Sequence, residues 1–255
     1  MELPLFPLNS VLCPGIALPL HIFEDRYREL VRHCIDTTSP FGIVLIREGR
    51  EVGTGAISFT GIGTIAEIRD AGRYEDGRYD LLVVGTRRFE IRRVLSGRRP
   101  YLVAEVEVLD ETIGDEAVAH RLAMAATRRF VTYLELLQPR DGETAEEIDV
   151  RVEVETADDD EDDDPGEETT TEDQAEDEGG RRRRVMIPDD PTVLSYLLAG
   201  IVQIESPRRQ ALLEESTTEA RLGTLLRTID REIFLLERRL RLYRPDARLH
   251  GSRRS

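Results

Sequence analysis

Residues Met1 to Val31 read MELPLFPLNSVLCPGIALPLHIFEDRYRELV, and prolines at positions 4, 7, 14 and 19 limit what this stretch can form. Each proline fixes φ and removes a backbone donor, so we expect extended pieces joined by tight corners and no helix before Pro19. From Phe23 onward apolar residues recur at helical spacing, at Phe23, Tyr27, Leu30, Val31 and Cys34. The stretch therefore predicts a strand, a proline corner, a second strand and then a helix.

Short β-type runs follow this opening as far as residue 112. Residues 41–47, 56–68, 78–85, 87–95 and 101–109 are β-branched or alternating runs separated by corners that contain glycine. In the run RRFEIRRVL, Phe89 and Ile91 lie on one side, whereas Arg88, Glu90 and Arg92 lie on the other, as in a half-buried strand. These runs and the single helix predict a small α+β barrel.

The apolar period changes to 3.6 residues after position 113, which predicts helices. The first has Asp115 as its cap and ends before Pro139. Asp190-Pro191 and Ser206-Pro207 each mark another helix start. Ser216 and Glu219 fit a capping box for a long final helix. We therefore expect four helices packed as a bundle over residues 113–250.

A strongly acidic segment interrupts this helical region. Residues 153–180 hold 16 acidic and no basic residues, so the formal charge of −16 is localised there. Subtracting these 16 from the 51 acidic residues leaves 35, which equals the number of basic residues. A segment with so few apolar residues cannot offset its ordering entropy, and we expect residues 141–184 to form a disordered insert.

Several classes of chemistry have no residues to support them. All 35 basic residues are arginine, which excludes a P-loop lysine, a Schiff base and a Ser-Lys dyad. We expect no metal site and no cofactor, because Cys13, His21, His33 and Cys34 lack the spacing of zinc ligands. No apolar run is long enough for a membrane span, and the proline-broken start does not resemble a signal peptide, so we expect a cytoplasmic protein.

The opening stretch resembles the start of the Lon protease N-terminal domain, the substrate-recognition part of that ATP-dependent protease. The resemblance continues through FGIVLIREG (41–49), VGTGAISFTGIGTIAEI (52–68), DGRYDLLVVGTRRFEIRRVL (76–95) and QALLEESTTEARLGTLLRTIDRE (210–232), in the family's order. It implies a PUA-like β pseudo-barrel with one helix over residues 1–112 and a helical subdomain over 113–250. Full-length Lon proteases add an AAA+ ATPase and a Ser-Lys peptidase domain, and a chain without lysine cannot form either active site.

The resemblance implies a non-catalytic module that binds exposed apolar segments of unfolded or partly folded polypeptides. An adaptor role, in which the bound polypeptides pass to a separate protease, is compatible with the resemblance. The resemblance does not determine the oligomeric state. The residues of the opening stretch that we consider as peptide-binding candidates are Leu5, Phe6, Leu18, Leu20, Ile22, Phe23, Glu24, Arg26 and Tyr27.

An RNA-binding module is the alternative function. PUA-like folds include RNA binders, and Arg87, Arg88, Arg92 and Arg93 lie around one strand close to Phe89. Outside the acidic segment the chain has no net charge to attract a polyanion, so we expect no nucleic-acid partner.

Overall fold

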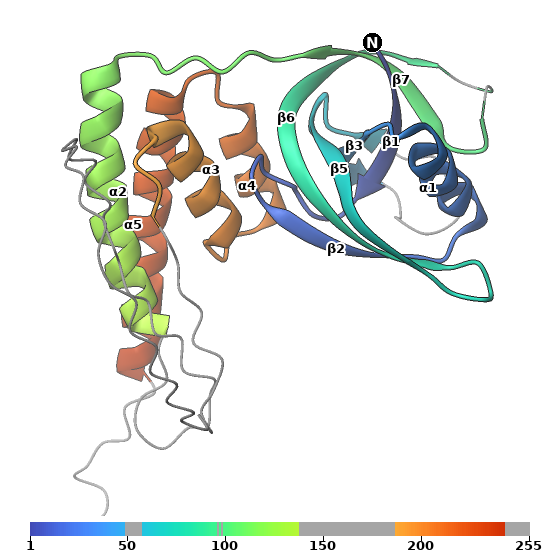
Figure 1. The fold of residues 1–255 in the computed structure, drawn as a ribbon. Coiled ribbons are helices and arrows are strands. Elements are labelled where there is room, and N and C mark those ends of the chain that lie inside the picture. The colour runs from blue at the N-terminus through green and yellow to red at the C-terminus, as the bar shows by residue number, and fades with distance from the viewer. Residues whose placement is uncertain (49–57, 96, 98, 138–186, 243–255) are drawn as a thin grey trace, which may run out of the picture.

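The first two strands and the first helix follow one another in the order that the opening stretch predicts. The computed structural model of the chain describes residues 1–48, 58–95, 97, 99–137 and 187–242, which form a sheet part and a helical part side by side (Figure 1). The sheet part consists of β1 (Glu2–Leu8), β2 (Ala17–Ile22), α1 (Asp25–Thr37), β3 (Phe41–Glu48), β4 (Ser58–Phe59), β5 (Ile62–Arg73), β6 (Tyr79–Leu95) and β7 (Leu102–Val108).

Five of these strands close a ring. The strand order runs β1, β7, β6, β5 and β3, and β1 also pairs with β3. The β1–β3 pair is parallel, with Leu5 opposite Gly42, and the other pairs among the described strands are antiparallel. β2 pairs with β6 and β4 pairs with β3, so both lie outside the ring. The α+β barrel is thus present, whereas its PUA-like classification stays a prediction.

The predicted boundary between the strands at 78–85 and 87–95 is wrong. The runs 78–85 and 87–95 form one continuous strand, which pairs with β2 and β7 on one edge and with β5 on the other. Gly85 lies where the two runs meet, and a side chain there would clash with the carbonyl oxygen of Cys13. The glycine serves close packing against the β1–β2 segment instead of breaking the strand.

α1 begins two residues later than the periodicity suggested. Its first residue is Asp25, and its buried face is formed by Tyr27, Leu30, Val31 and Cys34. Phe23 precedes the helix and is 48% exposed, so its assignment to the helical face was wrong. The reason is that β2 continues through Ile22 and the chain must turn before a helix can start.

Four helices form the rest of the described chain: α2 (Glu116–Leu137), α3 (Pro191–Ile201), α4 (Ser206–Glu214) and α5 (Thr218–Leu242). Asp115 caps α2 by accepting a bond from the Val118 N–H at 2.9 Å, and Asp190 caps α3 in the same way. The N-cap of α4 is Glu205, one residue before the predicted Ser206, whose hydroxyl instead donates to the carbonyl of Asn9 at 2.9 Å.

The predicted capping box of α5 is wrong in both of its residues. The Thr217 hydroxyl, and not Ser216, accepts a bond from the Ala220 N–H at 3.1 Å. The Glu219 carboxylate accepts from the Asp115 N–H at 2.9 Å, at the start of α2. Glu219 therefore ties two helices together instead of closing its own first turn.

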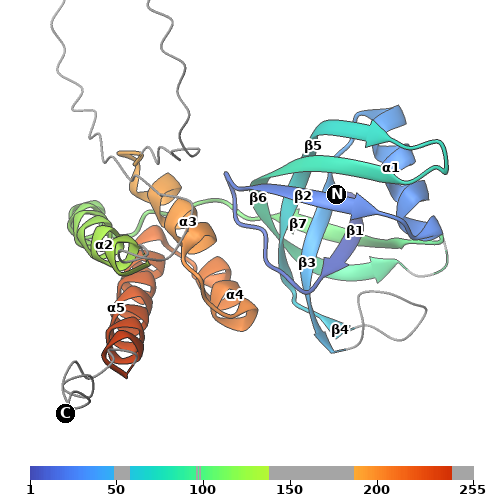
Figure 2. The ribbon, with the colours of Figure 1, turned by 90° about the horizontal axis from the view of Figure 1, so that it is seen from below.

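α2 and α5 run in the same direction as a long pair. They are joined at their starts by the Glu219 bond and further along by the ion pair between Arg129 and Asp230 at 2.8 Å. The shorter α3 and α4 lie between this pair and the sheet (Figures 1 and 2). The predicted disordered insert at 141–184 falls outside the described residues.

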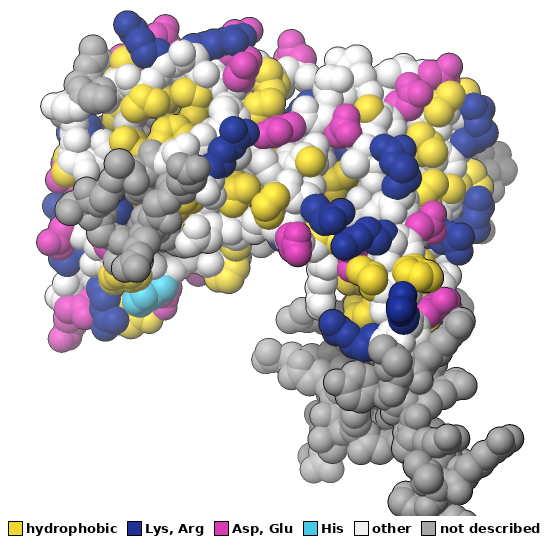
Figure 3. Space-filling view, turned by 180° about the vertical axis from the view of Figure 1, so that it is seen from behind, with side chains coloured by type: hydrophobic (Ala, Val, Ile, Leu, Met, Phe, Trp, Pro, Cys, Tyr) yellow, Lys and Arg dark blue, Asp and Glu magenta, His cyan; other side chains and the backbone are white. Residues whose placement is uncertain are grey.

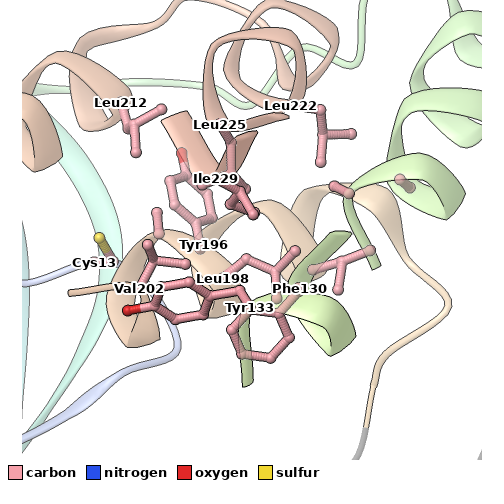
Figure 4. Packing of buried hydrophobic residues seen from close by; sticks show 14 of the residues in the cluster. Cys13, Phe130, Tyr133, Tyr196, Leu198, Val202, Leu212, Leu222, Leu225 and Ile229 are labelled. Atoms are coloured by element: carbon pink, nitrogen blue, oxygen red, sulfur yellow. The ribbon is translucent and has the colours of Figure 1, made fainter. Parts of the chain in front are cut away.

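The apolar core is divided between the two parts. The helical cluster includes Phe130, Tyr133, Leu198 and Leu225, and Cys13 reaches it from the segment between β1 and β2 (Figure 4). Two further clusters fill the sheet part, one against α1 and one around Phe89. The β1–β2 segment thus contributes to both parts and helps to fix them together.

Candidate polypeptide-binding surface

The strand pair β2–β6 has an inner and an outer face. Leu18 and Leu20 are only partly buried but pack against the cluster beneath α1. Pro19 and His21, which alternate with them, are exposed. Since side chains alternate across a strand, one face of β2 belongs to the core and the other faces solvent.

Apolar and aromatic side chains gather on this outer face. Phe23, Tyr74 and Leu82 are 48%, 45% and 41% exposed, and Leu82 lies opposite Pro19 in the sheet. The His21 ring is 6.2 Å from that of Phe23 and 6.3 Å from that of Tyr74, measured between centroids. We call these five residues, Pro19, His21, Phe23, Tyr74 and Leu82, the outer patch.

Polar groups fix the aromatic side chains of the outer patch. Asp80 accepts a hydrogen bond from the Tyr74 hydroxyl and pairs with His21 Nδ1 at 2.6 Å. The Tyr74 bond and then the His21 bond lower the pKa of Asp80 below its usual range, so this carboxylate is ionised at neutral pH. Arg78 lies over the Tyr74 ring, 5.5 Å from its centroid. The patch therefore combines apolar surface with an ordered polar border, as binding surfaces do.

The structure narrows the candidates taken from the opening stretch. Four of them are buried in the sheet part, namely Leu5, Phe6, Ile22 and Tyr27, and packing explains their apolar character. Leu18 and Leu20 face the core, so Phe23 is the large apolar candidate that remains well exposed. Leu5 and Phe6 lie on β1, which pairs with β3 on one side and with β7 on the other.

Glu24 and Arg26 form a local ion pair next to Phe23. Their Oε2 and Nη2 atoms are 3.0 Å apart, and the Arg26 guanidinium lies 4.5 Å from the centroid of the Tyr27 ring. Both side chains are about one fifth exposed, at 18% and 22%. The pair borders the outer patch, but its own partners account for its geometry.

The arginine strand of the nucleic-acid alternative is not a free basic surface. Arg92 pairs with Glu90 and Glu107, at 2.8 and 2.6 Å, and Arg93 pairs with Glu105 at 3.0 Å. Arg87 lies 3.4 Å from Asp110. On the face shown in Figure 3, basic and acidic side chains are likewise mixed, with apolar side chains between them. The charges of the strand are therefore largely compensated by neighbouring carboxylates.

Arg88 requires a correction, because it is buried and not on a solvated strand face. Its side chain is 2% exposed and donates to Glu111 through Nε at 2.8 Å and Nη2 at 3.2 Å. Its Nη1 donates to the carbonyls of Leu213 and Glu215, at the end of α4. The helical part covers this side of β6, which a strand pattern alone does not reveal.

A second buried arginine completes this junction. Arg221 donates to Glu111 at 3.3 Å and to the Ser195 hydroxyl at 3.1 Å, and its guanidinium lies 3.9 Å from the centroid of the Tyr196 ring. Burial lowers the pKa of Arg221 and raises that of Tyr196. Sequence reasoning missed Arg221, because its burial depends on the partners that α3, α4 and Glu111 bring to it.

Burial alone would raise the pKa of Glu111, but hydrogen bonds from Arg88 and Tyr196 and the charges of both arginines lower it. One carboxylate thus faces two guanidinium groups, and the carbonyls at the negative end of α4 supply the remaining acceptors. A hollow of about 240 Å³ opens beside Glu111 and Tyr196, lined also by Pro14 and Val193. Arg221 Nε also donates to the Leu212 carbonyl at 3.3 Å, so each nitrogen of both guanidinium groups has a partner. We therefore assign the cluster itself to structure.

Among the described residues, the cysteines and histidines do not assemble a metal centre. No group of three or more His, Cys, Asp or Glu side chains suited to a metal occurs within the described ranges. Cys13 and Cys34 are buried in different clusters, and burial raises the pKa of each thiol to about 11. In the same ranges, no helix combines the length and the apolarity that a membrane crossing needs.

Comparison with known proteins identifies relatives over most of the chain. The family described as the ATP-dependent protease La (LON) substrate-binding domain matches residues 2–231. A Lon protease from Anaeromyxobacter dehalogenans is 28% identical over 137 residues, which are 53% of this chain and 16% of the relative. Lon protease 2 from Myxococcus xanthus is 31% identical over 117 residues, or 46% and 14% of the two chains.

Solved structures show the same fold. A Lon N-terminal domain protein from Xanthomonas campestris is 26% identical, with a TM-score of 0.54 over 89% of this chain and 97% of that one. The N-terminal domain of a Mycobacterium avium complex Lon protease gives the same TM-score at 16% identity, over 90% and 98% of the chains, and supports the fold alone. The chain spans less than a fifth of the length of the two Lon proteases above. It belongs to the family of Lon substrate-binding domains.

Proposed function

We propose that this chain is a non-catalytic recognition module that binds exposed apolar segments of other polypeptides on the outer patch. The observation that carries the proposal is the exposure of Phe23, Tyr74 and Leu82 together on one side of a substrate-binding domain. In keeping with the family, we expect the module to act in the cytoplasm. Delivery of bound polypeptides to a separate protease is part of the proposal.

The chemistry of the outer patch supports weak, sequence-tolerant binding. Burying a large apolar side chain contributes about 1.5 to 3 kcal/mol, and association itself costs several kcal/mol, so a few such contacts give weak binding without a deep pocket. Tyr74 adds an aromatic surface whose hydroxyl keeps its partner Asp80 when the ring is covered. An apolar segment can therefore be bound with little loss of polar contacts.

Titration with casein, an unfolded and apolar-rich polypeptide, tests this function. We expect binding at tens of micromolar, weakened by about tenfold in Leu82→Asp, because a carboxylate then opposes burial of the segment. Met124→Asp is the matched control, since Met124 is 62% exposed on α2 and lies outside the patch. The absence of binding, or equal affinities of both variants, would refute the proposal.

Incubation of casein with the protein, with and without ATP, tests the non-catalytic assignment separately. The family match concerns the substrate-binding domain, and the chain holds no lysine for a nucleotide site or a Ser-Lys dyad. We therefore expect neither peptide cleavage nor ATP consumption. Turnover that survives further purification would contradict the assignment.

A further inference from the structure

A second contact surface lies between the end of α1 and β5, next to the outer patch, since Asp70 of β5 is paired with Leu82 of β6. A groove of about 510 Å³ separates the two elements and is lined by residues 34–35 and 38–40 on one side and by residues 67–71 on the other. Thr38, at φ +51°, ends α1 and turns the chain toward β3. We call this hollow the edge groove.

The β5 side of the edge groove is a strand edge without a neighbouring strand. β3 pairs with β5 only from Thr64 to Ala66, whereas β6 pairs with β5 as far as Arg73. The Ala71 N–H donates to Asp70 Oδ1 at 2.9 Å, a bond to a side chain and not to a strand. Beyond Ala66, the described part of the sheet thus leaves this edge of β5 open.

An open strand edge beside a groove suits an extended polypeptide. The edge supplies backbone donors and acceptors to a chain of any sequence, and the groove supplies contacts for alternate side chains. Here the Asp70 side chain occupies the position that an incoming carbonyl would take at Ala71. Such a local bond is readily exchanged for one to a bound strand.

The groove also indicates which side chains it accepts. Ile35 is 42% exposed and Ile68 is partly buried, so an apolar side chain fits between them. Of the charged lining residues, Glu67 and Arg69 pair with each other at 3.1 Å, so the net negative charge comes from Asp70. The last turn of α1 has no basic residue to balance its negative end. A basic side chain beside the apolar one is therefore favoured.

We infer that the edge groove binds an extended polypeptide segment with alternating apolar and basic residues, which pairs with β5 as an added strand. This inference rests on the proposed function, because it assigns a second contact surface to the same class of polypeptide. The outer patch would provide apolar contacts and β5 would provide backbone hydrogen bonds.

N-methylation of a peptide backbone tests this binding mode. The probe is a fluorescent peptide of about ten residues that alternates valine and arginine, a typical strand length. In a strand, alternate amides face the same edge, so methylating one alternate set should abolish binding to the full chain, whereas methylating the other set should not. Equal effects of the two sets, or the absence of binding by the unmodified peptide, would overturn the inference.

Substitutions in the groove give a second measurement. We expect Ile35→Arg to weaken peptide binding by about tenfold, because it fills the groove and repels the arginines. Ala71→Pro should weaken binding by about fivefold, as expected for one lost backbone hydrogen bond. Met124→Arg is the matched control, and circular dichroism checks that each variant is folded. Unchanged affinity in folded Ile35→Arg would overturn the inference.

The two surfaces fail in distinguishable ways. If casein binding depends on Leu82 but the alternating peptide does not bind, the proposed function stands and the strand-addition inference is wrong. If the peptide binds but loses affinity in Leu82→Asp and not in Ile35→Arg, the outer patch is its site and the inference is again wrong. A loss of peptide affinity in Ile35→Arg but not in Leu82→Asp supports strand addition at β5.

Discussion

Arg88 on β6 and Glu111 in the segment between β7 and α2 form a two-point ion pair that joins the sheet to the helices. The two nitrogen–oxygen distances are 2.8 and 3.2 Å, and the Arg88 side chain is almost fully buried. The same guanidinium donates to two carbonyls at the end of α4. One side chain of the sheet thus satisfies acceptors on two separate segments.

Arg88→Leu should lower the free energy of unfolding by about 3 kcal/mol, because it breaks the buried ion pair with Glu111 and removes the Arg88 bond to the Leu213 carbonyl. Arg92→Leu is the matched control on the same strand, since its pairs with Glu90 and Glu107 are exposed and should change stability by less than about 1 kcal/mol. Urea denaturation measures both values. Similar losses in the two variants would contradict a special role for the buried pair.

The pH dependence of stability should reveal Glu111. Its folded pKa is lowered, so its contribution is complete above the ordinary glutamate pKa of about 4.3 and is lost as the pH falls through the folded-state pKa. We expect Glu111→Gln to be less stable than the unaltered chain at pH 7, with the difference shrinking below about pH 4. Urea denaturation across this range measures it, and a constant difference would be the contrary result.

Gly63→Ala should be destabilising by about 1 to 3 kcal/mol, the usual range for overpacking. An added Cβ would lie 2.7 Å from Val44 Cγ1 and 2.8 Å from Phe89 Cζ, beside the backbone of β3. Gly61→Ala is the matched control, because nothing lies within 4 Å of its added Cβ. Thermal denaturation distinguishes the two, and a similar melting temperature for both would be incompatible with this packing.

Thr217→Ala should destabilise the protein by about 1 kcal/mol, since it removes the acceptor for the Ala220 N–H. Ser216→Ala, the substitution that the predicted capping box singles out, should have little effect. Chemical denaturation of both variants decides between the two caps. A larger loss for the serine variant would restore the original assignment.

Local signals predicted the helices well, because proline and capping residues act within one turn. Asp190 with Pro191 marked the start of α3, and Pro139 marked the end of α2 within two residues. The Ser216 error is of the same local kind, because Thr217 next to it is an equally good cap. Which of two neighbouring hydroxyl residues caps a helix depends on the direction from which the chain enters that helix. The sequence alone does not give this direction.

Contacts between distant segments were not predictable in this way. The parallel pairing of β1 with β3 and the burial of Arg88 and Arg221 depend on which elements meet in space. A charged residue between apolar ones is usually solvated. The Glu111 carboxylate and the carbonyls at the end of α4 allow these two arginines to be buried. The outer patch was found in part, through Phe23, whereas Tyr74 and Leu82 come from a hairpin more than fifty residues later.

The direct pairing of α2 with α5 also bears on how the chain between α2 and α3 can evolve. The hydrogen bond between Glu219 and Asp115 and the ion pair between Asp230 and Arg129 hold the two long helices in register. Each doubling of the length of such a connection costs only about 0.6 kcal/mol of closure entropy. We therefore expect insertions and deletions at this position to change the free energy of unfolding only slightly, so that its length and charge can vary between related chains.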